Sequence, residues 1–295
     1  MTFGSYLKDK LGNGELSSKS IIAKLQLNDS TFEKLDPVTL SRWINGRTTP
    51  ALEKQLSVMQ CFEPALYPYL KYIPAPAVPR SYRKVYEAVF DNIESSYHSI
   101  FALKDASASG LTLSFEHLDW SQFLNSVPGF FEATRSYSRV SLDKKKAHSD
   151  CVTFCSLSNE SRVVSHLSVS SDIECLKTIF GKELNVDTQK KAVVFNIGYF
   201  ICREHYNILL GLLLNHVCSV YEKIDDFYMV VRGRDFLSLG ESFGGKLISA
   251  NKESDVVGNI YLLKLDFIKT LSNPFIFSLL KSSYTKYQEM IECES

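Results

Sequence analysis

The stretch that decides the fold is Phe227–Ile248, FYMVVRGRDFLSLGESFGGKLI. It begins with an apolar run of strand length, continues into a short helical segment over Asp235–Phe243, and reaches another apolar run through two glycines. Upstream, Ala192–Cys202 has the character of a buried strand and Glu204–Lys223 that of a long apolar helix. Strand and helix therefore alternate along this half of the chain, which predicts an α/β or α+β domain.

The same patterns continue on both sides of this stretch. Cys151–Leu157 and Val163–Val169 alternate apolar and polar residues around a short polar segment, which predicts a β-hairpin. Tyr82–Leu103 is a predicted amphipathic helix. Further strands are predicted at Lys246–Ala250 and Gly258–Leu265. Residues 104–150 contain aromatic side chains typical of a core but show no clear period.

Proline marks the boundary between two predicted domains. Five of the 9 prolines lie in residues 63–80, where they interrupt any regular helix and favour an extended linker. A chain of 295 residues is also long enough for about two domains. We therefore expect a helical domain in residues 1–62, a proline-rich linker in residues 63–80 and an α/β domain in residues 81–295.

Composition excludes several classes of protein. Lys+Arg and Asp+Glu number 33 each, so the formal net charge is zero and the chain is not basic throughout. No apolar run reaches the ~18 residues of a membrane span, and the first residues lack the apolar segment of a signal peptide. The 7 cysteines are scattered, which fits a reducing compartment better than a disulfide framework. We expect a soluble, cytoplasmic protein with no membrane partner.

The segment Asp36–Pro50, DPVTLSRWINGRTTP, predicts a short helix with one polar side. The pair Asp36-Pro37 suits the start of a helix, and Asn45-Gly46 suits its end. The polar side offers an arginine, small hydroxyl residues and an amide, a set that can read base edges in the major groove of DNA. The spacing leaves open the alternative of a small helical bundle without a ligand.

The sequence LSRWINGRTTP resembles the recognition segment of lambda-repressor-like (Xre/Cro-C1 type) helix-turn-helix regulators, and SKSIIAKLQL resembles the preceding helix of that family. The resemblance implies an all-α helix-turn-helix N-terminal domain that reads DNA with the helix at residues 37–45. It assigns base contacts to this helix and phosphate contacts to its surroundings. The implied DNA-binding residues are Ser18, Lys19, Pro37, Val38, Thr39, Ser41, Arg42, Asn45, Arg47 and Thr48. The turn is longer than in the family, with extra residues around Asp29–Leu35.

The order of predicted elements in residues 151–265 resembles the later part of the GNAT acyltransferase fold, with Phe227–Ile248 as the best local match. The family's Arg/Gln-x-x-Gly-x-Gly/Ala pattern, which holds a pyrophosphate, falls on REHYNI. Here Tyr206 and Ile208 replace both glycines, and Glu204 repels a phosphate. The tyrosine that the family uses as proton donor is also missing near Gly240. The resemblance therefore implies a degenerate, non-catalytic GNAT-like domain.

Together these expectations describe a sequence-specific DNA-binding transcriptional regulator that is not an enzyme and needs no cofactor. Because one module binds DNA weakly, a homodimer on two half-sites is expected. The C-terminal domain would serve for dimerisation, for sensing a small-molecule effector or for binding a protein partner. Two alternatives stay open: a GNAT-type acyltransferase with a helical targeting domain, and an antitoxin-like DNA-binding partner of another protein.

Other residues that could form a metal, acid–base or thiol site have simpler interpretations. The residues with zinc-ligand chemistry are His148, Cys151, Cys155 and His166. They include no close Cys-x-x-Cys pair, so we interpret them as core or hairpin residues and predict no metal site. Glu116-His117 has no fixed geometry and receives no role. Cys202 is better explained as a buried cysteine than as a reactive thiol.

Overall fold

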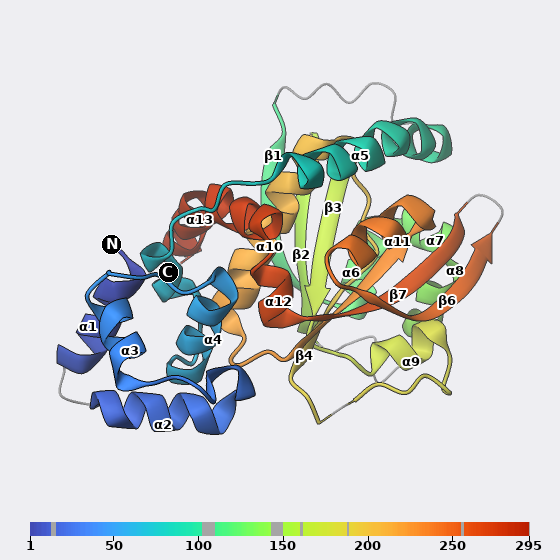
Figure 1. The fold of residues 1–295 in the computed structure, drawn as a ribbon. Coiled ribbons are helices and arrows are strands. Elements are labelled where there is room, and N and C mark those ends of the chain that lie inside the picture. The colour runs from blue at the N-terminus through green and yellow to red at the C-terminus, as the bar shows by residue number, and fades with distance from the viewer. Residues whose placement is uncertain are drawn as a thin grey trace. The chain divides into compact units, whose positions relative to one another are not determined.

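The structure is a computed structural model that describes residues 1–12, 16–101, 110–142, 150–159, 162–187, 189–254 and 257–294. It divides into two compact units, whose elements are labelled in Figure 1. The first unit contains Met1–Ala77 and Asn215–Lys223, and the second contains Val78–Leu214 and Ile224–Ser295. Within the described residues, no helix is long and apolar enough to cross a bilayer.

The first unit is built from helices whose starts are capped by side chains. The elements are α1 (Phe3–Gly12), α2 (Ser18–Asn28), the 3-10 helix η1 (Ser30–Phe32), α3 (Pro37–Ile44), α4 (Leu52–Phe62) and the 3-10 helix η2 (Tyr67–Tyr72). Ser17 and Ser20 form a capping box at the start of α2. At the start of α3, the backbone N–H of Thr39 donates to the Asp36 carboxylate at 2.6 Å. These caps satisfy backbone donors that the first turn of a helix leaves free.

The connection between α2 and α3 is longer than the turn of a helix-turn-helix. α2 ends at Asn28, α3 begins at Pro37, and the segment between them contains η1 with its buried Phe32. A helix-turn-helix joins its two helices through a turn of about 3–4 residues. The helix-turn-helix domain predicted from the sequence is therefore not confirmed.

Part of the predicted proline-rich linker is folded. It contains η2, in which Tyr67 and Leu70 are buried, and the N–H of Leu66 donates to the carbonyl of Cys218 at 2.9 Å. This part of residues 63–80 therefore packs within the first unit. The division of the chain at residues 62 and 80 stays a prediction.

The second unit is centred on a sheet formed by seven strands of the described residues. Across the sheet they are β1 (Thr112–Asp119), β2 (Asp150–Asn159), β3 (Arg162–Ser170), β4 (Ala192–Phe195), β5 (Asp226–Arg232), β7 (Gly258–Asp266) and β6 (Lys246–Ser254). β4 and β5 are parallel, and the other neighbouring strands are antiparallel. The sheet is therefore mixed, with its parallel pair in the interior.

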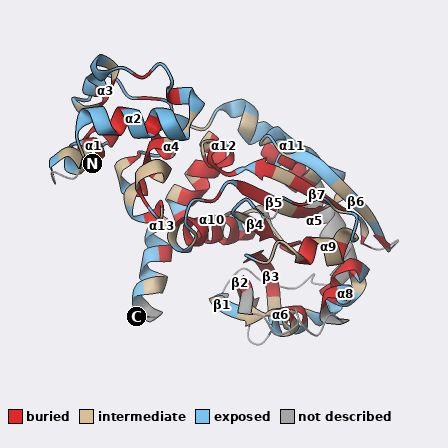
Figure 2. Ribbon diagram, turned by 90° about the horizontal axis from the view of Figure 1, so that it is seen from below, coloured by how far each residue is buried: buried red, intermediate tan, exposed pale blue. Residues whose placement is uncertain are grey.

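Helices lie on both faces of this sheet. They are α5 (Arg80–Phe101), α6 (Trp120–Ser126), α7 (Pro128–Ala133), α8 (Arg135–Leu142), α9 (Cys175–Phe180), α10 (Arg203–Val220), α11 (Gly233–Ser242), α12 (Phe267–Leu271) and α13 (Pro274–Glu294). On one face α11 packs so closely that a Cβ on Gly240 would lie 2.3 Å from Leu263 of β7. On the other face Phe123 of α6 packs against Phe154 of β2. Figure 2 shows the middle strands as largely buried.

The C-terminal half therefore has an α+β fold with a mixed sheet, consistent with a GNAT-like part. β2 and β3 pair as the predicted hairpin, and its turn residues Glu160 and Ser161 lie outside the described residues. The predicted helix at Tyr82–Leu103 corresponds to α5, whose described part ends at Phe101. Residues 104–150, which have no clear period in the sequence, contain β1 and the short helices α6 to α8.

Candidate functional site

A β-bulge ends β4. Phe195 lies opposite Val169 of β3, and farther along the chain Tyr199 lies opposite His166. Between these two pairs the β4 side has one residue more than the β3 side, which defines a bulge. Beyond it, His166 N–H donates to the Tyr199 carbonyl at 2.6 Å, and Tyr199 N–H donates to the His166 carbonyl at 3.1 Å. The strand predicted over residues 192–202 is therefore shorter than expected, because the bulge turns the chain toward β3.

Strand β5 continues beyond the point where β4 turns away. Its parallel pairing with β4 ends at Phe195 and Met229, whereas β5 runs on to Arg232. Neighbouring strand residues direct their N–H and C=O groups to opposite sides. At least one residue of Val230–Arg232 therefore directs these groups toward the side that β4 has left. The two strands part here, and a pocket lies between them.

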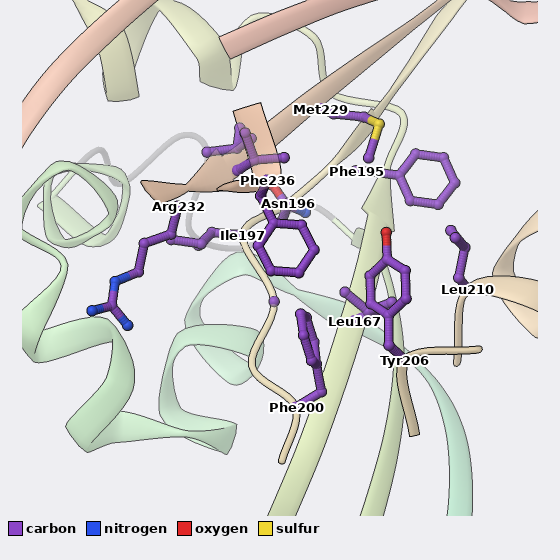
Figure 3. Close-up of a pocket in the computed structure, with 13 residues that line it drawn as sticks. Leu167, Phe195, Asn196, Ile197, Phe200, Tyr206, Leu210, Met229, Arg232 and Phe236 are labelled. Atoms are coloured by element: carbon purple, nitrogen blue, oxygen red, sulfur yellow. The ribbon is translucent and has the colours of Figure 1, made fainter. Parts of the chain in front are cut away.

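The pocket, shown in Figure 3, is lined mainly by apolar side chains. Strand β5 provides Met229 and Val231, α10 provides Tyr206 and Leu210, and α11 provides Phe236. The other lining residues are Leu167, Phe195, Asn196, Ile197, Gly198, Phe200, Val230 and Arg232. The enclosed volume is about 30 Å³, which is room for about two water molecules. Only a small group fits in a cavity of this volume.

Gly198 brings the main chain to the wall of the pocket. A Cβ at this position would lie 2.2 Å from Leu167 Cδ2 and 2.8 Å from the carbonyl oxygen of His166. Gly198 lines the pocket, and its backbone N–H lies within the bulge, where the regular ladder of hydrogen bonds is interrupted. Among the described residues this N–H has no hydrogen-bond partner. The bulge therefore brings the main chain at Gly198 to the wall of the pocket.

A buried polar network holds the bulge from the other face of the sheet. Tyr137 of α8 is fully buried, and its hydroxyl accepts a hydrogen bond from Ile197 N–H at 3.0 Å. The same hydroxyl donates to Asn196 Oδ1 at 3.4 Å, and Asn196 Nδ2 donates to Ser168 Oγ at 3.1 Å. Burial raises the pKa of Tyr137 well above its usual value, so the hydroxyl keeps its proton. The network fixes the backbone next to Gly198.

The N-terminus of α10 follows the bulge, and Cys202 lies directly before its first turn. Cys202 precedes the helix, and its thiol interacts with the backbone N–H groups of Glu204 and His205. The N–H of Tyr206 donates to the Cys202 carbonyl at 3.3 Å. Burial raises the pKa of Cys202, so the thiol stays protonated at neutral pH. We therefore assign Cys202 a capping role.

Charges at this helix start are also paired. Arg203 lies 3.3 Å from the carboxylate of Glu204 and 3.8 Å from that of Glu87 in α5. The pKa of Glu204 is lowered, mainly because its own backbone N–H donates to the carboxylate. Glu204 is exposed and carries its negative charge at neutral pH. The first turn of α10 is therefore a poor place for an anion.

A buried serine–histidine pair fastens this segment to the sheet. Ser165 Oγ of β3 lies 2.7 Å from His205 Nδ1 and accepts a hydrogen bond from Ile201 N–H at 3.1 Å. Burial lowers the pKa of His205, so its ring is neutral and can accept the serine proton. The pair fixes the entry into α10 beside the pocket.

Aromatic rings form the outer wall of the pocket. The Tyr206 ring centroid lies 4.8 Å from that of Phe200, 5.1 Å from that of Phe90 and 5.8 Å from that of Phe236. Figure 3 shows the hydroxyl end of Tyr206 directed among the lining side chains. The guanidinium of Arg232 points away from them, and its Nε donates to the Val257 carbonyl at 2.6 Å. Tyr206 thus supplies a polar group inside an apolar wall.

The residues that were predicted from the sequence to bind DNA lie in the first unit. They gather in α2, in α3 and in the segment after α3. Nine of them are exposed and the tenth, Thr39, is half-buried. The exposed residues are Ser18, Lys19, Pro37, Val38, Ser41, Arg42, Asn45, Arg47 and Thr48. None of these ten residues lines the pocket. Conversely, Gly198 is not among the functional residues predicted from the sequence.

The described residues contain no cluster of three or more His, Cys, Asp or Glu side chains arranged to hold a metal. Cys155 and His166 occupy successive register positions of the hairpin and therefore lie on opposite faces of the sheet. His148 lies outside the described residues. Glu116 and His117 are exposed on β1, away from the residues that line the pocket.

Solved structures similar to this chain are acyl-transferring enzymes. NAA60 from Arabidopsis thaliana in complex with acetyl-CoA has a TM-score of 0.30 at 10% identity, over 52% of this chain and 98% of that one. A variant of spermidine N-acetyltransferase SpeG from Vibrio cholerae has a TM-score of 0.32 at 14% identity, over 55% and 97%. The CoA-dependent acyl-homoserine lactone synthase BjaI has a TM-score of 0.37 at 8% identity, over 58% and 90%. No family model and no curated protein matches the chain.

These findings correct the interpretation of the chain as a DNA-binding transcriptional regulator of the lambda-repressor-like (Xre) type. The similar structures cover the C-terminal half and are acetyltransferases and a lactone synthase, not DNA-binding proteins. The expectations of a DNA partner, of a chain that is not an enzyme and of a non-catalytic C-terminal domain are wrong for the same reason. The homodimer inferred from DNA half-sites loses its basis.

Proposed function

We propose that the second unit transfers an acyl group from a thioester donor to a nucleophile in the opening between β4 and β5. The observation that carries the proposal is the bulge at the end of β4, which places Gly198 in the wall of the pocket with its N–H without a partner among the described residues. Acyl transfer places negative charge on the carbonyl oxygen of the donor as the nucleophile attacks. A fixed backbone N–H in an apolar, water-poor site stabilises that charge.

The opening also suits the shape of a thioester donor. The acyl end fits the enclosed part of the pocket, whose walls at Met229, Leu210 and Phe236 are apolar. The arm of the donor can lie along β5, whose last residues have no β4 partner. An extended chain that contains amides binds to such an exposed strand in the manner of an added strand.

Tyr206 is the candidate for proton transfer. During the reaction the acyl carbon bonds to the nucleophile, which loses a proton to solvent, and the C–S bond of the thioester breaks, so that the leaving thiolate takes up a proton. The family's tyrosine in the short helix is missing here, because Gly240 and Glu241 occupy that part of α11. Tyr206 lines the pocket from α10 and is 5% exposed, so its hydroxyl can reach the sulfur from the opposite wall.

The test is acceptor-dependent release of thiol. The full chain is incubated with acyl-CoA and acyl-pantetheine donors of increasing chain length, and released thiol is followed with a colorimetric reagent. The acceptors are a primary amine, spermidine and S-adenosylmethionine, chosen because the similar enzymes act on or bind the last two. We expect thiol release that requires an acceptor and is lost in Gly198→Ala. Release that stays at the buffer rate with every donor and acceptor contradicts the proposal.

A further inference from the structure

The pocket and the buried Tyr137 lie on opposite faces of the sheet. Successive residues of a strand direct their side chains to opposite faces. Leu167 of β3 lines the pocket, whereas the preceding His166 directs its ring to the other face, where it lies 5.8 Å from the ring of Phe131. The Tyr137 ring lies 5.5 Å from the same Phe131 ring. Tyr137 therefore reaches the bulge from the face of the sheet that the pocket does not occupy.

The hydroxyl of Tyr137 is the acceptor for a main-chain donor of the bulge. The N–H of Ile197 donates to this hydroxyl at 3.0 Å, and Ile197 is 1% exposed, so water has little access to the N–H. The same hydroxyl donates to Asn196 Oδ1 at 3.4 Å. A buried N–H that loses its partner is costly, because it keeps the cost of desolvation without the hydrogen bond. One side chain thus holds the two residues directly before Gly198.

Helix α8 is itself held by a buried carboxylate of β6. Ser136, the neighbour of Tyr137, donates its N–H to Glu253 Oε2 at 2.8 Å and its hydroxyl to Glu253 Oε1. Asn251 Nδ2 donates to Ser136 Oγ at 3.2 Å and to the Ile179 carbonyl at 2.8 Å. Glu253 is 4% exposed, so these bonds are shielded from water. Because its first turn is tied to β6, α8 presents the tyrosine hydroxyl at a fixed place.

We infer that Tyr137 is a positioning residue for the pocket, which sets the place of Gly198 in the wall without touching a ligand. Gly198 follows Asn196 and Ile197 directly and has no room to move toward Leu167, since a Cβ on it would lie 2.2 Å from that side chain. A shift of about 1 Å in a reacting site can slow a reaction by about 10²-fold. The inference rests on the proposed function, to which it adds a residue outside the pocket.

The experiment compares two variants of the full chain that each lose one buried hydroxyl. Tyr137→Phe removes the acceptor for Ile197 N–H and keeps the ring. Thr134→Val is the matched control, because Thr134 is also fully buried but its hydroxyl donates to the Phe130 carbonyl at 3.0 Å and not to the bulge. Amide hydrogen exchange is followed at single residues by NMR, stability by urea unfolding, and kcat and KM by thiol release from acetyl-CoA.

We expect the Ile197 amide to exchange about tenfold faster in Tyr137→Phe, beyond any change in the amides of β7, and to be unaffected in Thr134→Val. We also expect kcat to fall by about tenfold or more in Tyr137→Phe, with KM within about twofold of the parent, because charge on the carbonyl oxygen develops only during attack. The control should keep the parental kcat. Unchanged exchange at Ile197, or an equal loss of kcat in both variants, would overturn the inference.

The exchange data separate this inference from the proposed function. If the Ile197 amide responds to Tyr137→Phe but the parent chain acylates no acceptor, Tyr137 positions the pocket wall and the proposed function is wrong. If the parent chain transfers acyl groups and Tyr137→Phe has the parental kcat, the proposed function stands and the positioning role is wrong.

Discussion

The two ends of one short segment, Asn196–Gly198 and Cys202–Tyr206, use their backbone donors in opposite ways. At the first end the bulge leaves Gly198 N–H without a described partner beside the pocket. At the second end the thiol of Cys202 interacts with the N–H groups of Glu204 and His205 in the first turn of α10. The contrast shows that a helix start next to a pocket is not by itself a binding site. What matters is whether the chain has already satisfied its donors.

The largest effect should come from Gly198→Ala. The new Cβ would lie 2.2 Å from Leu167 and 2.8 Å from the His166 carbonyl, so the bulge must shift. We expect a loss of about 1–3 kcal/mol in the free energy of unfolding. Because the donor N–H moves with the backbone, acyl transfer should fall by about 10²-fold. Urea unfolding and thiol release measure the two effects.

Gly129→Ala is the matched control for this variant. Gly129 lies in α7, where a Cβ would meet no atom within 4 Å, and its backbone φ is not in the left-handed region. The control should leave both stability and transfer close to those of the parent chain. Equal transfer rates in the two alanine variants would show that the bulge donor is not part of the reaction.

The pH dependence of stability tests the contribution of His166, whose backbone pairs with that of Tyr199 directly after the bulge. Burial lowers the pKa of His166 from 6.5 to about 3, and within the described residues neither ring nitrogen has a hydrogen-bond partner. The folded state therefore binds fewer protons than the unfolded state between these values, so stability is lost as the pH falls below about 6.5. At pH 5 the loss relative to pH 7 should be about 2 kcal/mol.

His166→Phe isolates this contribution. The variant lacks the titrating ring but keeps an aromatic side chain among Phe130, Phe131 and Phe154, which surround the position. Urea unfolding of both chains at pH 7 and pH 5 gives the difference, since other titrating groups act on both alike. If the variant loses as much stability as the parent, His166 is not responsible for the pH dependence.

Tyr206→Phe tests the polar group in the aromatic wall. The ring contacts with Phe200 and Phe236 are kept, so the free energy of unfolding should change by less than about 1 kcal/mol. If the hydroxyl delivers the proton to the leaving thiolate, kcat should fall by at least about 10²-fold for acetyl-pantetheine. An unchanged kcat would remove Tyr206 from the reaction.

The sequence predicts local elements better than it predicts the site. Alternation of strand and helix around Phe227–Ile248 leads to the α+β unit, because each element buries its own periodic face. The bulge depends on the register between β4 and β3, a long-range property that no spacing reveals. Gly198 was the one indication of the bulge in the sequence. An isolated glycine within a predicted strand, here residues 192–202, often marks a bulge or a close backbone approach.

The incorrect prediction of DNA binding has a related cause. The segment Asp36–Pro50 carries exposed polar side chains on a short helix, a pattern that many small helical units share. The length of the segment between α2 and α3 was visible in the sequence, whereas the 3-10 helix that buries Phe32 was not. Tyr206 shows the reverse case. Its replacement of a glycine indicated an inactive domain, yet the structure places its hydroxyl in the pocket.

The smallest effect should come from Cys202, and it bears directly on the contrast between the two ends. Cys202→Ser keeps a side chain that can accept hydrogen bonds from Glu204 and His205 N–H, and serine is a favoured N-cap residue, so stability should be nearly unchanged. Cys202→Ala removes the acceptor and should cost about 1 kcal/mol in the free energy of unfolding. The alanine variant leaves both N–H groups without a side-chain acceptor, so the difference in the free energy of unfolding between the serine and alanine variants measures the contribution of the cap. If the serine and alanine variants have the same free energy of unfolding, Cys202 does not cap α10 and the contrast between the two ends fails.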